Sequence, residues 1–105
     1  MSISMKDKLI IDVINVLKKT KAIIKDIGID VAWSRFDSEE DVIAALDDHI
    51  ENLLSHNFSN IWDLIILFAP TGSLQEISIS NGWGAEYLAL ASEFDTAINE
   101  LKRIT

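Results

Sequence analysis

Apolar residues recur at every third or fourth position in three long segments of the chain, which is the spacing of one side of an α-helix. The spacing predicts helices over about 4–27, 38–56 and 85–103. In the first of these segments the apolar positions cover a broad arc, so we expect that helix to be deeply buried.

The ends of these helices carry recognisable signals. Gly28 follows the first segment, where glycine is a common C-terminal stop. The second helix can be capped by Asp37 or Ser38, with Glu40 or Asp41 three positions later as the reciprocal partner. These signals support the first two predicted helices independently of their apolar spacing.

The stretch between the second and last helices fits two structures. A mostly apolar run over 61–68, interrupted by Asp63, is followed by alternation around Ile77 and Ile79, which is typical of a β-hairpin around Pro70. Cap signals at Asn60 and over 73–76 favour helices. A lone hairpin is marginally stable, and no third strand is predicted elsewhere. We therefore favour two short helices, about 60–68 and 73–80.

The predicted fold is mostly α, a compact bundle of three main and two short helices that forms one globular domain over 1–105. The alternative is an α+β fold in which a small β-hairpin at 61–80 packs on the helices. The apolar fraction of 49% is enough for a packed core.

Composition narrows the functional classes. The chain has no cysteine, which excludes disulfides, a thiolate metal site and a cysteine nucleophile. No uncharged apolar stretch approaches the length needed to span a bilayer. We therefore expect a cytoplasmic protein that does not bind membranes.

Charge is distributed unevenly along the chain, whose formal net charge is -8. Residues 1–27 carry six lysines and three aspartates, whereas 28–101 carry fourteen acids and only Arg35. A surplus of three cations cannot neutralise thirteen excess anions, so part of the acidic surface must remain. This balance argues against nucleic-acid binding, which needs cationic surface.

Seven of the acids lie over 37–51, a stretch without a basic residue. We expect them to form a solvated helix face, partly neutralised by Lys18, Lys19, Lys21 and Lys25 of the first helix. Complementary charge speeds association and favours particular partners. The candidate contacts for a basic protein partner on this face are Asp41, Asp47, Asp48 and Glu51.

Trp83 stands between two glycines, in the sequence Asn81-Gly82-Trp83-Gly84. The glycines indicate a helix stop and restart, in which Trp83 covers the edge of the core. The alternative is a recognition loop in which Trp83 anchors a partner. Five other aromatic residues are expected in the core: Trp33, Phe58, Trp62, Phe68 and Phe94.

No residue pattern predicts catalysis, a cofactor or a metal ion. His49 and His56 are the only histidines and are separated by about 10.5 Å of helix rise, too far to share one ion. We expect both to be boundary histidines that touch solvent. The serines do not stand in a nucleophile pattern, and neighbouring carboxylates such as Asp47 and Asp48 diverge around a helix.

The order of these elements resembles that of the bacteriocin-nuclease immunity proteins. The shared features are a first helix, an acidic helix opening with Asp-Ser-Glu-Glu at 37–40, a short apolar stretch ending in Pro70, and a last helix. Phe68-Ala69 stands where that family has paired tyrosines before the proline, so no site residue is transferred. The resemblance implies an inhibitor or immunity-type protein.

The leading hypothesis is thus a small acidic interaction domain that docks on a basic protein. One alternative is a small-ligand binder or enzyme with a pocket near Trp83 and Tyr87, with polar groups from Asn81, Thr71 or Gln75. Another is a subunit of a homo-oligomer, in the simplest case a homodimer, with Ile11 of the first helix buried between chains.

Overall fold

Helix α1 (Met5–Ile27) opens a computed structural model that describes residues 4–31, 36–70 and 72–104. Four more helices follow: α2 (Glu39–Leu54), α3 (Ile61–Leu67), α4 (Ser73–Ser80) and α5 (Gly84–Ile104). The described residues contain no strand. The predicted mostly-α fold is confirmed, and the β-hairpin alternative at 61–80 is wrong, because this stretch folds into two helices. The predictions that involve Trp33, Arg35 and Thr71 lie outside the described residues.

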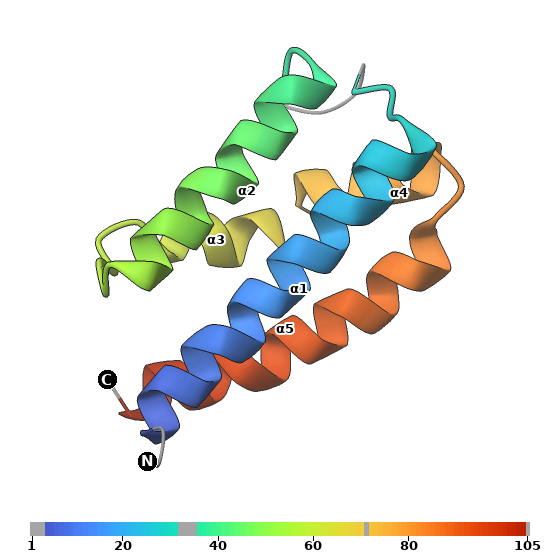
Figure 1. Ribbon diagram of the computed structural model, residues 1–105. Coiled ribbons are helices and arrows are strands. Elements are labelled where there is room, and N and C mark those ends of the chain that lie inside the picture. The colour runs from blue at the N-terminus through green and yellow to red at the C-terminus, as the bar shows by residue number, and fades with distance from the viewer. Residues whose placement is uncertain (1–3, 32–35, 71, 105) are drawn as a thin grey trace.

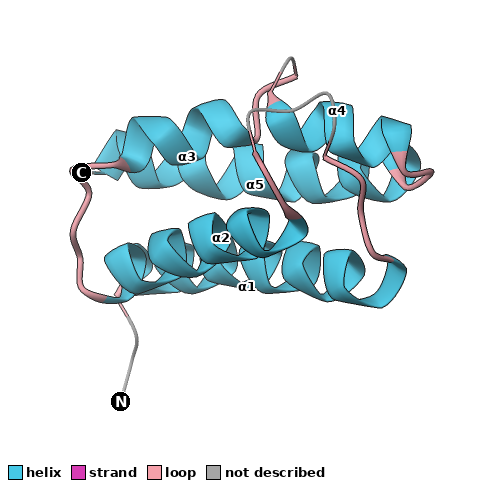
Figure 2. Ribbon diagram, turned by 90° about the horizontal axis from the view of Figure 1, so that it is seen from above, coloured by secondary structure: helices cyan, strands magenta, loops and turns pink. Residues whose placement is uncertain are grey.

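The helices form two layers (Figures 1 and 2). α1 and α2 lie side by side in one layer, and α3, α4 and α5 form the other. α1 packs most extensively on α5, and the two run antiparallel, so that α1 begins and α5 ends at the same end of the molecule. Antiparallel neighbours joined by short turns are the usual arrangement of helical bundles.

Local sequence explains where the first two helices begin and end. Ser4 caps α1 and Ser38 caps α2, each hydroxyl accepting a hydrogen bond from the backbone N–H three residues later. α1 ends at Ile27. The C-cap residue is Gly28, whose φ of 75° and ψ of 151° lie in a region open almost only to glycine. Of the two residues predicted to cap α2, Ser38 is the N-cap and Asp37 is not.

The cap signals predicted for the short helices are not used. The N-cap of α4 is Gly72, and Ser73 is already inside the helix, so the expected capping box does not form. Asn60 precedes α3 but makes no side-chain cap bond. A Cβ on Gly72 would lie 2.4 Å from the carbonyl oxygen of Ile66. The turn between α3 and α4 is therefore so tight that only glycine fits there.

An aromatic cluster sits in the core between the layers. The rings of Phe68 and Phe94 stack with centroids 4.3 Å apart, and Phe68 also stacks on Tyr87 at 6.1 Å. Trp83 meets Tyr87 edge-on at 6.2 Å. Such pairs add to the free energy gained from burial alone. Leucine and isoleucine side chains from all five helices complete the core.

One aromatic prediction needs correction. Trp62 was expected in the core, but 63% of it is exposed, because α3 directs Leu64 and Leu67 inward instead. Trp83 packs edge-on against Tyr87, and Leu88 is exposed. None of the described helices has the length and apolarity needed to cross a bilayer.

Candidate interaction surface

The solvent side of α2 carries five acidic residues, here called the acidic face: Glu40, Asp41, Asp47, Asp48 and Glu51. All five are exposed. The buried residues of α2 lie on its opposite side: Val42, Leu46, His49, Ile50 and Leu53. The helical spacing therefore gathers the acidic residues on one side instead of spreading them around the molecule.

The acidic residues in the first turn of α2 are stabilised by their position at the N-terminal end of the helix. The backbone N–H of Asp41 donates to Ser38 Oγ at 3.2 Å, which fixes the N-terminal end of the helix. Glu39, Glu40 and Asp41 lie at this end, where the helix dipole favours anions. Glu39 is not part of the acidic face, because its Oε1 accepts a hydrogen bond from the backbone N–H of Ile29 at 3.0 Å.

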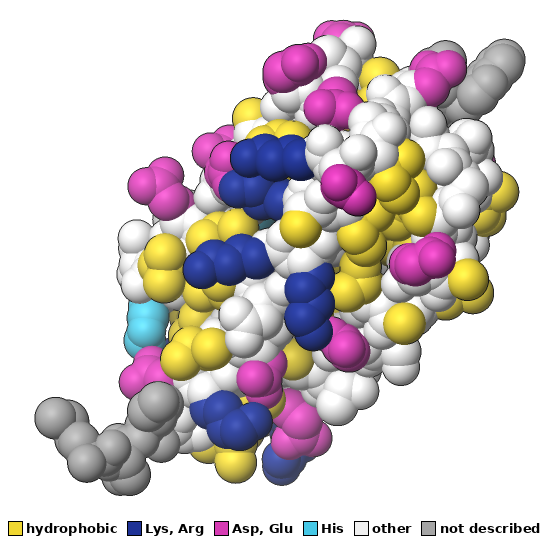
Figure 3. All heavy atoms as spheres, turned by 45° about the vertical axis from the view of Figure 1, so that its right-hand side comes forward, with side chains coloured by type: hydrophobic (Ala, Val, Ile, Leu, Met, Phe, Trp, Pro, Cys, Tyr) yellow, Lys and Arg dark blue, Asp and Glu magenta, His cyan; other side chains and the backbone are white. Residues whose placement is uncertain are grey.

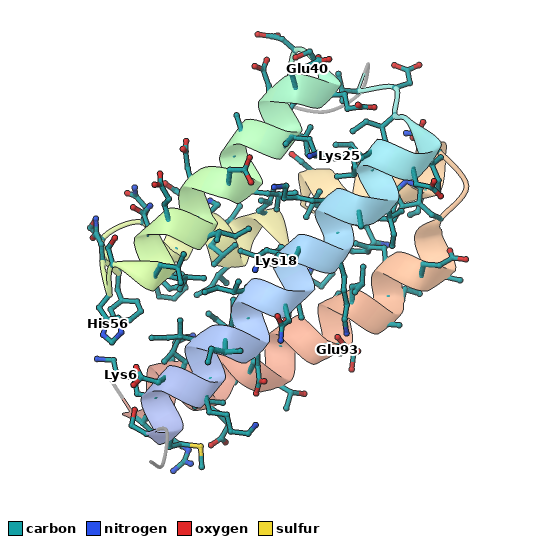
Figure 4. The ribbon with its side chains drawn as sticks, viewed as in Figure 1. Lys6, Lys18, Lys25, Glu40, His56 and Glu93 are labelled. Carbon is teal, nitrogen blue, oxygen red and sulfur yellow. The ribbon has the colours of Figure 1, made fainter. Side chains whose placement is uncertain are left out.

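Two of the four lysines expected to neutralise this face form ion pairs. Lys21 on α1 pairs with Asp47 on α2. Lys19 pairs instead with Glu93 on α5, at 3.2 Å. Lys18 and Lys25 form no ion pair with another described residue. Lys25 lines an open hollow of about 340 Å³ between α1 and α2, together with Glu40 and Asp47. Figure 4 shows Lys18 and Lys25 along α1.

The remaining carboxylates stay uncompensated. Asp41, Asp48 and Glu51 form no ion pair with any residue that the structure describes. Figure 3 shows lysines down the middle of the molecule, acidic side chains at its top and left border, and further acidic side chains among the lysines and to their right.

The acidic face ends beside an apolar hollow. This hollow of about 310 Å³ is lined by Ile10, Ile11, Ile14, Leu53 and Leu54, with Asp7 and His56 at its rim. Leu54 is 65% exposed and lies one turn beyond Glu51. Because an apolar centre with a charged rim is the usual composition of a protein interface, the hollow makes this surface better suited to a protein partner than acids alone would.

Trp83 does not belong to this surface. It is 1% exposed and lies in the core, so its side chain offers nothing for a partner to contact in this conformation. Its location is the one expected of a helix stop and restart, with Gly82 at a φ of 84°. Tyr87 is equally buried. Neither side chain is among those that line the open hollows described here.

Asn81, one of the polar residues expected near Trp83, has a structural role. It joins α4 to the segment after α1: its Nδ2 donates to the carbonyl of Asp30 at 3.0 Å, and its Oδ1 accepts the N–H of Asp30 at 2.9 Å. Gln75 lines a hollow with Pro70 and residues of α5. Among the described residues predicted for a ligand pocket, Gln75 alone lines this hollow, and Asn81, Trp83 and Tyr87 do not.

The two histidines are separated by the fold. His49 is buried on the core side of α2, contrary to the expectation that it touches solvent. His56 is half-exposed, and its Nε2 lies 3.4 Å from a carboxylate oxygen of Asp7. Among the described residues, no three histidine or acidic side chains are arranged to hold a metal ion.

The structure also shows one exposed aromatic residue that sequence reasoning placed in the core. Lys102 Nζ lies 5.0 Å from the centroid of the Trp62 ring, and Ile66 is exposed one turn further along α3. The only signal in the sequence for the exposure of Trp62 is its spacing of four residues from Ile66, which becomes informative once α3 is known to be helical.

No family model matches the chain, and comparison with curated proteins and with solved structures gives no match.

Proposed function

We propose that this protein is an interaction domain that docks on a basic protein through the acidic face of α2. The single observation that carries the proposal is the exposure of Asp41, Asp48 and Glu51 on one side of one helix without a cation among the described residues to neutralise them. Uncompensated charge of one sign raises the rate at which an oppositely charged partner arrives.

The apolar hollow offers an apolar contact, which the acidic residues do not provide. Exposed ion pairs contribute little net affinity, so a stable complex also needs an apolar contact that is removed from water. Leu54 and Ile11 stand exposed at the end of the acidic face. A partner that places an apolar side chain over these two residues brings its neighbouring lysines or arginines to Glu51 and Asp48.

This arrangement suits an inhibitor or immunity-type role in the cytoplasm. Proteins that act on nucleic acids carry basic surfaces, and an acidic protein that covers such a surface competes with the phosphate backbone for it. The predicted partner is therefore a basic protein. The charge of the acidic face supports the basic partner, whereas the inhibitor or immunity-type role is what the resemblance to the bacteriocin-nuclease immunity proteins implies.

The test uses a probe of known chemistry. A helical peptide with leucines on one side and lysines on the other is titrated into isotopically labelled protein, and the perturbed backbone amides are mapped by NMR. We expect the largest shifts along α2 and around Leu54. A matched peptide with glutamate in place of lysine should leave α2 unperturbed. Shifts concentrated on α5 would contradict the proposal.

A pair of variants separates the surface from total charge. Asp48→Asn with Glu51→Gln neutralises two carboxylates of the acidic face, and Glu76→Gln with Glu86→Gln neutralises two exposed carboxylates of α4 and α5. Both variants change the net charge equally. The first should weaken peptide binding by about tenfold, and the second should change it by less than about twofold. Equal losses would show attraction to bulk charge only.

A further inference from the structure

A second surface, independent of the acidic face, lies on the other layer of the molecule. α3 exposes two large apolar side chains one turn apart, Trp62 at 63% and Ile66 at 54%. Tryptophan is the residue most enriched at the energetic centres of protein interfaces. Exposed apolar side chains mark an interaction site when they are contiguous, and Trp62 and Ile66 are neighbours on one side of α3.

α5 continues this surface. Leu88, Asp95 and Lys102 are spaced seven residues apart and are exposed on the same side of the helix. Lys102 connects this row to α3, because its Nζ lies over the Trp62 ring. An open hollow of about 330 Å³ runs between Pro70 and the α5 residues from Leu88 to Asn99. We call the exposed set Trp62, Ile66, Asp95 and Lys102 the α3–α5 face.

The charges on the α3–α5 face are complementary to those on a second copy of the same face. Asp95 and Lys102 have opposite sign and lie about 10.5 Å apart along the helix axis. A two-fold axis that passes between them, near Asn99, places Asp95 of one copy opposite Lys102 of the other, and the reverse pair follows by symmetry. Asp95 forms no ion pair with any described residue of its own chain.

We infer that the α3–α5 face binds a second copy of this chain, in a two-fold dimer with antiparallel α5 helices. Trp62 and Ile66 of each copy flank the paired α5 helices and lose contact with water. Lys102 keeps its position over the Trp62 ring and gains the carboxylate of Asp95 from the other copy. Cation–π contacts strengthen when the pair is removed from water, so dimerisation favours this arrangement.

The inferred dimer leaves the acidic face uncovered. A dimer through α1 and α2 by way of Ile11, the alternative considered from the sequence, would bring the two acidic faces near each other. Because α3 and α5 lie in the other layer, the inferred dimer holds both acidic faces outward (Figure 2).

The experiment measures the mass of the full chain by sedimentation over a wide range of protein concentration. We expect a concentration-dependent shift from one chain to two. Asp95→Lys and Lys102→Glu should each weaken the dimer by about tenfold or more, because each puts like charges opposite one another twice. The double variant that carries both changes should return the dissociation constant to within about threefold of the wild-type value.

Two further variants complete the test. Trp62→Ala should abolish the dimer while leaving the helical content unchanged, because the side chain is exposed. Asp48→Lys, on the acidic face, should leave the dimer intact, which separates this inference from the proposed function. A single-chain mass at every concentration would overturn the inference. A double variant as weak as the single variants, or an equal loss from Asp48→Lys, would also overturn it.

Discussion

The ammonium group of Lys21 on α1 bonds the carboxylate of Asp47 on α2, and this ion pair joins the two helices of the first layer. Asp48, the next residue, forms no ion pair within the described part of the chain. Two adjacent aspartates therefore have different roles. Asp47 contributes to the packing of α2 on α1, whereas Asp48 is available only to solvent or to a partner.

This difference predicts unequal costs of substitution. Asp47→Ala should lower the free energy of unfolding by about 0.5–1 kcal/mol, because it leaves the largely covered Lys21 without its partner. Asp48→Ala should change it by less than about 0.5 kcal/mol. Urea unfolding of both variants measures the difference, and a double-mutant cycle with Lys21→Ala isolates the pair. Equal costs for the two aspartates would contradict the assignment.

The turn between α3 and α4 predicts a second asymmetry, between two glycines. A Cβ at Gly72 would meet the carbonyl oxygens of Ile66 and Leu67 at 2.4 and 2.9 Å, so the backbone must shift. Gly72→Ala should therefore lower the free energy of unfolding by about 1–3 kcal/mol.

Gly84 provides the matched control. A Cβ there meets only the side chain and backbone of Ile79, at 3.5 Å or more, which is ordinary contact. Gly84 is the first residue of α5, where alanine restricts the unfolded chain without strain. Gly84→Ala should be neutral or should raise the free energy of unfolding by about 0.4–1 kcal/mol. Thermal unfolding of the two variants should therefore shift in different directions or by clearly different amounts.

The stacked rings of Phe68 and Phe94 give a third prediction, for the core. Phe94 is 1% exposed and touches Phe68 at the centre of the aromatic cluster. Phe94→Ala should lower the free energy of unfolding by about 3–5 kcal/mol, because it removes a buried ring and leaves a cavity. Phe58→Ala is the control, since Phe58 is only partly buried, and should cost less. Equal costs would show that the cluster is not the centre of the core.

The three long helices could be predicted from the sequence because their apolar spacing continues over many turns. The inward-facing side of α3 could not be predicted from apolar spacing. Six of its seven residues are apolar, so the sequence does not indicate which of Trp62, Leu64 and Leu67 face inward. Packing against the rest of the fold decides this. The exposure of Trp62, and with it the α3–α5 face, therefore follows only from the structure.

The acidic surface was predictable as a surplus of charge, but its pairing was not. Lys19 and Lys21 are two residues apart, yet Lys19 reaches Glu93 on α5 and Lys21 reaches Asp47 on α2. Which helix each lysine faces depends on how α1 sits between its two neighbours. Trp83 shows a similar limit, because flanking glycines are equally compatible with a buried and an exposed side chain.

The single tyrosine of the chain predicts how stability changes at alkaline pH. Burial raises the pKa of the Tyr87 hydroxyl, and the carboxylate of Asp95 raises it further. Above a pH of about 10 the unfolded chain loses this proton, whereas the folded chain keeps it. The folded state then binds more protons, so the free energy of unfolding falls as pH rises, by up to about 1.4 kcal/mol per pH unit.

Tyr87→Phe isolates this effect from the titration of the lysines, which both proteins share. The variant should lose the tyrosine-dependent part of the alkaline destabilisation. Near neutral pH it should be as stable as the wild type or more stable, because the Tyr87 hydroxyl is buried without a hydrogen-bond partner among the described residues. Urea unfolding at neutral and alkaline pH compares the two proteins. Tyrosinate absorbance reports directly on Tyr87, since no other tyrosine is present. Ionisation of the folded protein with an ordinary tyrosine pKa would show that the ring reaches water and would contradict its place in the core.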